Sequence, residues 1–151
     1  MQIRPIQSRD QERVKELISG ILSKEFQFGH SAYPYGDLDS IDKVYGGKRE
    51  QFFVMGDDGE IAGTVGIKEE SKKTAIIRRL FVNPSSRKKG FGGLLLDRAL
   101  DFCKEKDYHE AVFHAATTMK SAIKLCRSRG FKETEKLVSG GIDIIKFVVT
   151  F

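Results

Sequence analysis

The stretch RRLFVNPSSRKKGFGGLLL, residues 78–96, decides the fold of this chain. Its apolar run Leu80–Val82 is typical of a strand, and Asn83 and Pro84 then end that strand. Three cations, Arg87–Lys89, stand directly before three glycines in four positions. The leucines that follow begin an apolar pattern with helical spacing. The sequence therefore predicts a strand, a basic glycine-rich loop and a helix, in that order.

The predicted loop has the features of a phosphate-binding site. Its amides lie at the start of a helix, where unpaired N–H groups and the helix dipole attract anions. Glycine has no Cβ, so the backbone can approach a phosphate closely, and the cations add charge attraction. A Walker loop is excluded because the lysines precede the glycines, and a Rossmann fingerprint because Leu95 stands where its third glycine belongs. The alternative is a solvated surface loop.

The first 22 residues predict an opening strand followed by a helix. Residues 1–6 form an edge or opening strand, because Pro5 cannot donate a hydrogen bond to a central ladder. A helix starts at Ser8, which forms a capping box with Gln11. Its apolar stripe consists of Val14, Leu17, Ile18, Ile21 and Leu22.

The remaining elements complete a mixed α/β pattern. We expect a short helix over 39–45, antiparallel strands over 51–55, 61–70 and 74–82, a helix over 94–106, a strand over 110–115, a helix over 118–129 and a final hairpin over 131–151. The predicted fold class is α/β, or α+β by some conventions, with a mostly antiparallel mixed central sheet flanked by helices. The chain is expected to form a single domain, residues 1–151.

Composition limits the classes of function. The chain has 151 residues, of which 40% are apolar and 31% charged, with a net charge of +5, which suits any anionic partner. No apolar run approaches the roughly 18 residues of a membrane span, so we expect a cytoplasmic protein without a membrane partner. Cys103 and Cys126 lack CxxC spacing, so neither a disulfide nor a metal site is expected.

Two motifs carry a resemblance to a known family. Residues 78–96 resemble the central strand, pyrophosphate loop and helix of the GNAT family of acetyl-CoA-dependent N-acetyltransferases, and AIKLCRSRGFKE, residues 122–133, is similar to that family's later helix. The resemblance implies a GNAT-type acyl-CoA N-acyltransferase fold. It also implies an enzyme that transfers the acetyl group of acetyl-CoA to a primary amine by direct attack.

The same resemblance assigns the cofactor-binding residues. Leu80, Phe81 and Val82 would line the pantetheine arm of acetyl-CoA, although core packing would also explain them. The pyrophosphate would lie against the loop residues Arg87, Lys88, Lys89, Gly90, Phe91, Gly92 and Gly93.

The catalytic residues of the family are missing from their usual positions. Relatives often carry a glutamate where this chain has Ile76 and a tyrosine where it has Cys126. The candidates are therefore Cys126 as an acid and Glu69, next to Glu70, as a base acting through water. A buried apolar thiol and a solvated carboxylate are the alternatives. His30 and His114 are further candidates.

The acceptor and the partners are predicted only coarsely. In this fold the acceptor amine would bind between segment 25–50 and the final hairpin, with Phe28 and Tyr33 as aromatic walls. Its partners would be acetyl-CoA and an amine of a small molecule or protein, in a monomer or a homodimer. One alternative is a coenzyme A-binding module without efficient turnover. Another is a nucleic-acid binder, which the local confinement of the basic run disfavours, so no nucleic-acid partner is expected.

Overall fold

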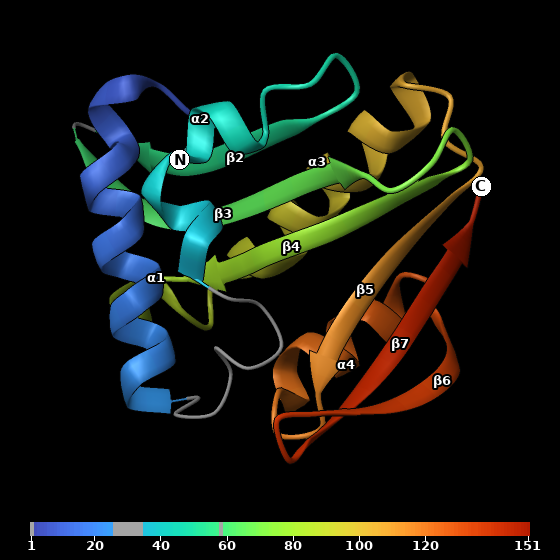
Figure 1. The fold of residues 1–151 in the computed structure, drawn as a ribbon. Coiled ribbons are helices and arrows are strands. Elements are labelled where there is room, and N and C mark those ends of the chain that lie inside the picture. The colour runs from blue at the N-terminus through green and yellow to red at the C-terminus, as the bar shows by residue number, and fades with distance from the viewer. Residues whose placement is uncertain (1, 26–34, 58) are drawn as a thin grey trace.

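A mixed sheet forms the centre of the computed structural model, which describes residues 2–25, 35–57 and 59–151 (Figure 1). In these residues the sheet has seven strands in the order β1-β2-β3-β4-β5-β7-β6. The strands are β1 Gln2–Pro5, β2 Gln51–Asp57, β3 Glu60–Glu69, β4 Thr74–Val82, β5 Glu110–Ala116, β6 Lys132–Ser139 and β7 Ile142–Thr150. Neighbouring strands are antiparallel except β4 and β5, so the predicted fold class is confirmed.

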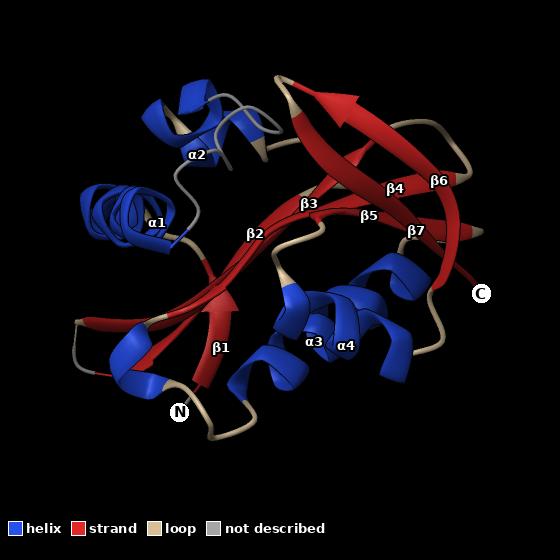
Figure 2. Cartoon of the chain, turned by 90° about the horizontal axis from the view of Figure 1, so that it is seen from below, coloured by secondary structure: helices blue, strands red, loops and turns tan. Residues whose placement is uncertain are grey.

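Helices cover both faces of the sheet. The α-helices are α1 Gln11–Glu25, α2 Ile41–Val44, α3 Phe91–Glu105 and α4 Lys120–Ser128, and the short 3-10 turns are η1 Ser8–Asp10, η3 Tyr35–Asp39 and η4 Pro84–Ser86. Figure 2 shows α1 and α2 on one face of the sheet and α3 and α4 on the other. No helix in the described ranges has the length and apolar character required to cross a membrane.

The two faces bury separate apolar clusters. Val14, Ile18 and Ile21 of α1 pack with residues of β2 such as Phe52 and Val54. On the other face, α3 contributes the side chains Leu95, Leu96, Ala99, Phe102 and Cys103. Because each fully buried Leu, Ile or Phe side chain is worth roughly 1.5–3 kcal/mol, these two stripes supply much of the driving force for folding.

Two predicted helix starts are wrong by a few residues. Ser8 and Gln11 do not form the capping box; Asp10 accepts from the amide of Gln7 at 2.9 Å, and Ser8–Asp10 is a 3-10 turn. Asp10 takes this role because the guanidinium of Arg4 holds its carboxylate with bonds of 2.7 and 3.0 Å. The second helix, α3, starts at Phe91 rather than in the leucines, so it includes Gly92 and Gly93 in its first turn.

The parallel strands β4 and β5 separate toward their carboxyl ends. They pair from Thr74 with Glu110 to Ile77 with Phe113, and their described residues are not paired with each other beyond that point. Past this point β4 stays paired with β3 as far as Val82, and β5 stays paired with β7 as far as Ala116. Figure 1 shows the two strands diverging. We call this opening the split; ligands commonly bind at such a place in α/β sheets.

Candidate functional site

A cleft of about 540 Å³ lies at the split, within the usual size of ligand pockets. Four parts of the chain line it: the end of β4, the loop and first turn of α3, the start of α4, and the end of α1. Its lining residues are Glu25, Leu80, Phe81, Val82, Arg87, Lys88, Gly90, Phe91, Gly92, Thr118, Met119, Lys120, Ser121, Ala122 and Leu125.

Most of the residues predicted to bind the cofactor meet in this cleft. Leu80, Phe81 and Val82 line one wall of the cleft. The predicted loop residues also line it, with the exception of Lys89 and Gly93. Lys89 is exposed to solvent, whereas Gly93 is buried, and a Cβ added to it would lie 2.6 Å from Nη2 of Arg129. Gly93 therefore serves the packing of α3 against α4. The binding roles themselves stay predictions.

The start of α3 presents backbone amides next to the cleft. Gly90 has a φ of 81° and precedes the helix, and the amide of Leu94 makes the first backward bond, 3.2 Å to the oxygen of Gly90. The amides before Leu94 have no acceptor within the helix. A Cβ added to Gly92 would lie 3.5 Å from Leu125 Cδ2 and 3.7 Å from Val82 Cγ2, which are ordinary contacts between cleft-lining residues. The cleft thus contains backbone amides at a helix start, which is the kind of group that can bind an anion; that these amides do so stays a prediction.

Side-chain bonds hold the loop that precedes α3. The side-chain oxygen of Asn83 accepts from the amide of Ser85 at 3.1 Å. Arg87 donates from Nε to the oxygen of Val82 at 3.1 Å, and its two terminal nitrogens donate to the carboxylate of Glu25 at 2.5 and 2.9 Å. The cation nearest to the end of β4 is therefore bound to the protein itself.

A β-bulge lies in β4 just before the cleft. Between the pairs Thr64–Phe81 and Gly66–Arg78, β3 has one residue and β4 has two, Arg79 and Leu80. Arg79 has a φ of 55°, in the left-handed region that glycine usually occupies in such bulges. For a residue with a side chain this conformation costs roughly 1–2 kcal/mol, so other contacts must stabilise it.

Arg79 belongs to a buried polar cluster, which we call the Arg79–Asp37–Tyr45 cluster. Arg79 is 3% exposed and donates to the carboxylate of Asp37 from Nε at 3.0 Å and Nη2 at 2.6 Å. The hydroxyl of Tyr45 donates to the same carboxylate at 2.7 Å. Burial alone would raise the pKa of Asp37, but these hydrogen bonds outweigh it and lower the pKa below its ordinary value. Burial, with the adjacent carboxylate, raises the pKa of Tyr45, so its hydroxyl stays protonated.

The sheet face opposite α3 and α4 carries a second group of side chains at the split. Ala75 and Ile77 of β4 and Ala111, Phe113 and Ala115 of β5 pack on the α3 side. By strand alternation, Ile76 and Arg78 of β4 and His114 of β5 lie on the other face, which α1 and α2 partly cover.

His114 lies beside Lys146 of β7 in the strand register. Burial, and after it the charge of Lys146, lowers the pKa of His114 below 6.5. Its imidazole is therefore neutral at pH 7.

The structure does not bring the two catalytic candidates to the cleft. Cys126 of α4 is 0% exposed and belongs to the same core cluster as the buried side chains of α3, while its neighbour Leu125 lines the cleft. Burial raises the pKa of the Cys126 thiol to about 12. Its surroundings agree with a buried apolar thiol, the alternative that the sequence left open. Cys103 and Cys126 are both buried free thiols in the structure.

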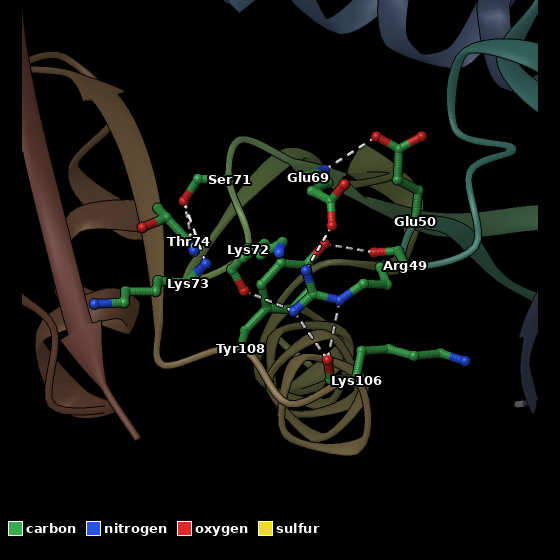
Figure 3. A network of polar contacts seen from close by, with 9 residues as sticks. All are labelled: Arg49, Glu50, Glu69, Ser71, Lys72, Lys73, Thr74, Lys106 and Tyr108. Atoms are coloured by element: carbon green, nitrogen blue, oxygen red, sulfur yellow. Dashed lines mark hydrogen bonds and ion pairs between the residues drawn. The ribbon is translucent and has the colours of Figure 1, made fainter.

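Glu69 belongs to a network at the opposite end of β4 (Figure 3). Its Oε2 accepts from Arg49 at 2.5 Å, and Arg49 also donates to the oxygens of Lys72 and Lys106. The same guanidinium lies over the ring of Tyr108 at 3.9 Å. Glu69 is paired with Ala75, which precedes Leu80 by about 16 Å of strand. The contacts of Arg49 therefore join the segment just before β2 to the end of β3, the β3–β4 turn and the end of α3.

Other predicted residues lie outside the described part of the chain. Phe28, Tyr33 and His30 all fall within 26–34, so the structure does not report on their predicted roles. Among residues 2–25, 35–57 and 59–151, no group of three or more His, Cys, Asp and Glu side chains could hold a metal ion.

Sequence reasoning missed part of the cleft. Thr118–Ala122 and Leu125 line it at the start of α4, and Glu25 lines it at the end of α1. The position of α4 could have been found, because the helix that follows β5 must begin at the carboxyl end of that strand, next to the end of its parallel neighbour β4. Glu25 carries no local signal, since a charged residue at a helix end is ordinary.

Comparisons with known proteins agree with this geometry. The sequence pattern of the acetyltransferase (GNAT) family matches residues 15–131. Human N-acetyltransferase 8 is 30% identical over 104 residues, which cover 65% of this chain and 46% of that protein. The chain spans about half the length of the curated relatives it matches.

Solved structures share the fold over nearly the whole chain. A GNAT-family acetyltransferase from Staphylococcus aureus Mu50 has a TM-score of 0.86 at 21% identity, covering 99% of this chain and 98% of its own. Spermidine N-acetyltransferase from Vibrio cholerae, in complex with CoA and spermine, has a TM-score of 0.77 at 21% identity, covering 99% and 94%. With the family pattern extending through most of the sequence, the chain belongs to the GNAT family of acetyltransferases.

Proposed function

We propose that this protein is an acetyl-CoA-dependent N-acetyltransferase that acts on a primary amine. The observation that carries the proposal is the cleft at the split, where the amides at the start of α3 meet the end of β4. Support comes from family membership and from solved structures with a similar fold, which include one with acetyl-CoA and one with CoA and spermine.

The residues of the cleft fit acetyl-CoA in two respects. The first-turn amides of α3, with glycines at 90 and 92, can receive a pyrophosphate without steric hindrance from a Cβ. Beyond Ile77, the described part of β4 has no ladder partner on the β5 side, so its backbone can bond to the amides of a pantetheine arm. When bound, acetyl-CoA supplies the thioester whose acetyl group passes to the amine.

The acceptor amine would approach from the face that carries Arg78 and His114. A primary amine has a pKa near ~10, so something must take its proton before it can attack. We assign this task to His114, which follows Phe113, the last residue of β5 that pairs with β4, and so lies at the start of the split on this face, outside the residues that line the cleft. Burial and the charge of Lys146 lower its pKa, which favours the neutral imidazole. Correct placing of the two reactants supplies much of the remaining acceleration.

The test is an acetyl-CoA binding measurement followed by a panel of amines. We expect acetyl-CoA to raise the melting temperature of the purified protein, because it binds only the folded state. Release of free CoA is then followed with polyamines, amino acids, aminoglycosides and peptides, in wild type and in His114→Gln. His114→Gln should lower kcat and remove the acidic limb of its pH profile. Binding without turnover on any amine would instead identify a coenzyme A-binding module, and no binding would refute the proposal.

A further inference from the structure

The β4 bulge decides which side chain faces the apolar core. Ala75 and Ile77 point toward α3, so strict alternation would send Arg79 into the same apolar cluster. The extra residue of the bulge breaks this alternation, and Leu80 packs there instead. Phe81 then packs with α1 on the opposite face. The bulge therefore sets the direction of the backbone that lines the cleft.

Contacts on both sides hold Arg79 in its left-handed conformation. Its side chain is held by Asp37, which Tyr45 also contacts. Its carbonyl oxygen accepts from the hydroxyl of Thr64 at 2.8 Å, and Thr64 is fully buried. Each side chain that stabilises the bulge is thus itself held in place by packing or by a second bond.

The cluster also connects the cleft to the segment that precedes β2. Asp37 lies in η3, whose Leu38 is fully buried against α1. Gln11 of α1 donates to the oxygen of Leu38 at 2.6 Å and accepts from the amide of Ile41 at 3.0 Å. The carboxylate of Asp37 is therefore carried by a well-anchored turn.

We propose that the Arg79–Asp37–Tyr45 cluster is a positioning device, which holds the bulge of β4 and thereby places the backbone of Leu80–Val82 for the acyl end of acetyl-CoA. This inference rests on the proposed function. Arg79, Asp37 and Tyr45 act through the backbone of β4, so they are positioning residues.

A matched pair of variants separates positioning from stability. Asp37→Asn removes the charge that Arg79 contacts. Asp10→Asn removes the charge that Arg4 contacts with a similar two-pronged geometry of 2.7 and 3.0 Å, and Asp10 does not line the cleft. Both variants should lower the melting temperature. Only Asp37→Asn should weaken acetyl-CoA binding in calorimetry, by about tenfold, because small misplacements at a reacting site are costly.

Hydrogen exchange gives a readout that needs no ligand. Exchange of the amides of residues 80–82 should become faster in Asp37→Asn than in Asp10→Asn, relative to the rest of β4. A rescue variant completes the design: Asp37→Ala with Arg79→Gly removes both charges of the cluster, and glycine adopts the left-handed conformation freely. Acetyl-CoA binding should recover in this double variant compared with Asp37→Ala alone.

The outcomes separate the two proposals. Equal acetyl-CoA affinity and equal exchange at residues 80–82 in Asp37→Asn and Asp10→Asn would overturn the positioning role while leaving the proposed function intact. Failure of the double variant to recover binding would also count against it. Absence of acetyl-CoA binding by the wild-type protein would overturn the proposed function, and with it the role given to the cluster.

Discussion

Arg87 and Glu25, which are 62 residues apart in the chain, form a two-pronged ion pair at the cleft, with distances of 2.5 and 2.9 Å. The pair joins the loop before α3 to the end of α1. It also places a carboxylate where the proposed ligand would bring phosphates. Arg87 is therefore bonded within the protein, and the amides of α3 must supply much of the attraction for an anion.

Glu25→Gln should bind acetyl-CoA about two- to fivefold more tightly than wild type, the size expected for a partly exposed charge. The substitution removes a negative charge from the cleft and releases the guanidinium of Arg87 from its ion pair. Calorimetric titration at low salt measures the effect. Asp97→Asn is the control, because Asp97 pairs with Arg129 in a similar two-pronged geometry outside the cleft. Weaker binding in Glu25→Gln would show that the ion pair itself organises the site.

Gly92→Ala should abolish most of the acetyl-CoA affinity, by about tenfold or more, with the fold intact. The added methyl group meets only ordinary contacts with Leu125 and Val82, so the folded protein accommodates it, but it enters the cleft beside the amides. Gly20→Ala in α1 is the control, since nothing lies within 4 Å of its added Cβ. It should raise the free energy of unfolding by up to about 1 kcal/mol and leave the affinity unchanged. Normal affinity in Gly92→Ala would refute the loop assignment.

Cys126→Ala should leave kcat unchanged, once an acceptor amine is known. Its thiol is buried in the core and protonated up to a pKa of about 12, so it serves packing. Cys103→Ala is a matched control, because Cys103 is equally buried and burial raises its pKa to about 12 as well. Both variants should lose about 1 kcal/mol of stability through the cavity they create. A selective loss of kcat in Cys126→Ala, with acetyl-CoA binding retained, would make this thiol a catalytic acid.

Glu69→Gln should likewise preserve kcat/KM, because Glu69 lies in the network around Arg49 rather than at the split. A small fall in the melting temperature is expected, since partly exposed ion pairs contribute less than about 1 kcal/mol. Tyr108→Phe, which removes the bond of 2.7 Å from the Tyr108 hydroxyl to the oxygen of Arg49, should act in the same direction. A tenfold fall in kcat/KM for Glu69→Gln alone would restore this residue as a candidate base.

Acid should destabilise the protein through Asp10 and Asp37. Hydrogen bonds from Arg4 lower the pKa of Asp10, and those from Arg79 and Tyr45, opposed by burial, lower the pKa of Asp37; the ordinary value for both is 3.8. As the pH falls below the ordinary pKa, these carboxylates take up protons in the unfolded chain but stay ionised in the folded chain. The stability that they contribute is therefore fully present above the ordinary pKa, and it is lost as the pH falls through their lowered pKa values in the folded protein. Urea unfolding between about pH 5 and pH 2 should show a shallower loss in Asp37→Asn than in wild type. An unchanged slope would mean that the carboxylate is not held ionised.

Local patterns in the sequence were sufficient for most of the fold. Neighbouring residues determine the apolar stripe of Val14, Ile18 and Ile21, and also the strand–loop–helix order of residues 78–96. In both places the spacing of the apolar side chains fits only one type of element and one buried face. Local sequence also predicted much of the cleft. Leu80–Val82 and the glycines of the next loop lie close together in the chain, so the strand and the loop that follows it bring them to the same place.

Tertiary structure alone decided the bulge, because it depends on a partner that is distant in sequence. Arginine at a left-handed position carries no local signal, and its conformation is stabilised by Asp37, which is 42 residues away. The same reason applies to Glu25 beside Arg87 and to Glu69 beside Arg49. A charged side chain can pair with any opposite charge that folding brings within reach, so its partner follows from the packing of the helices and strands and not from the residues next to it.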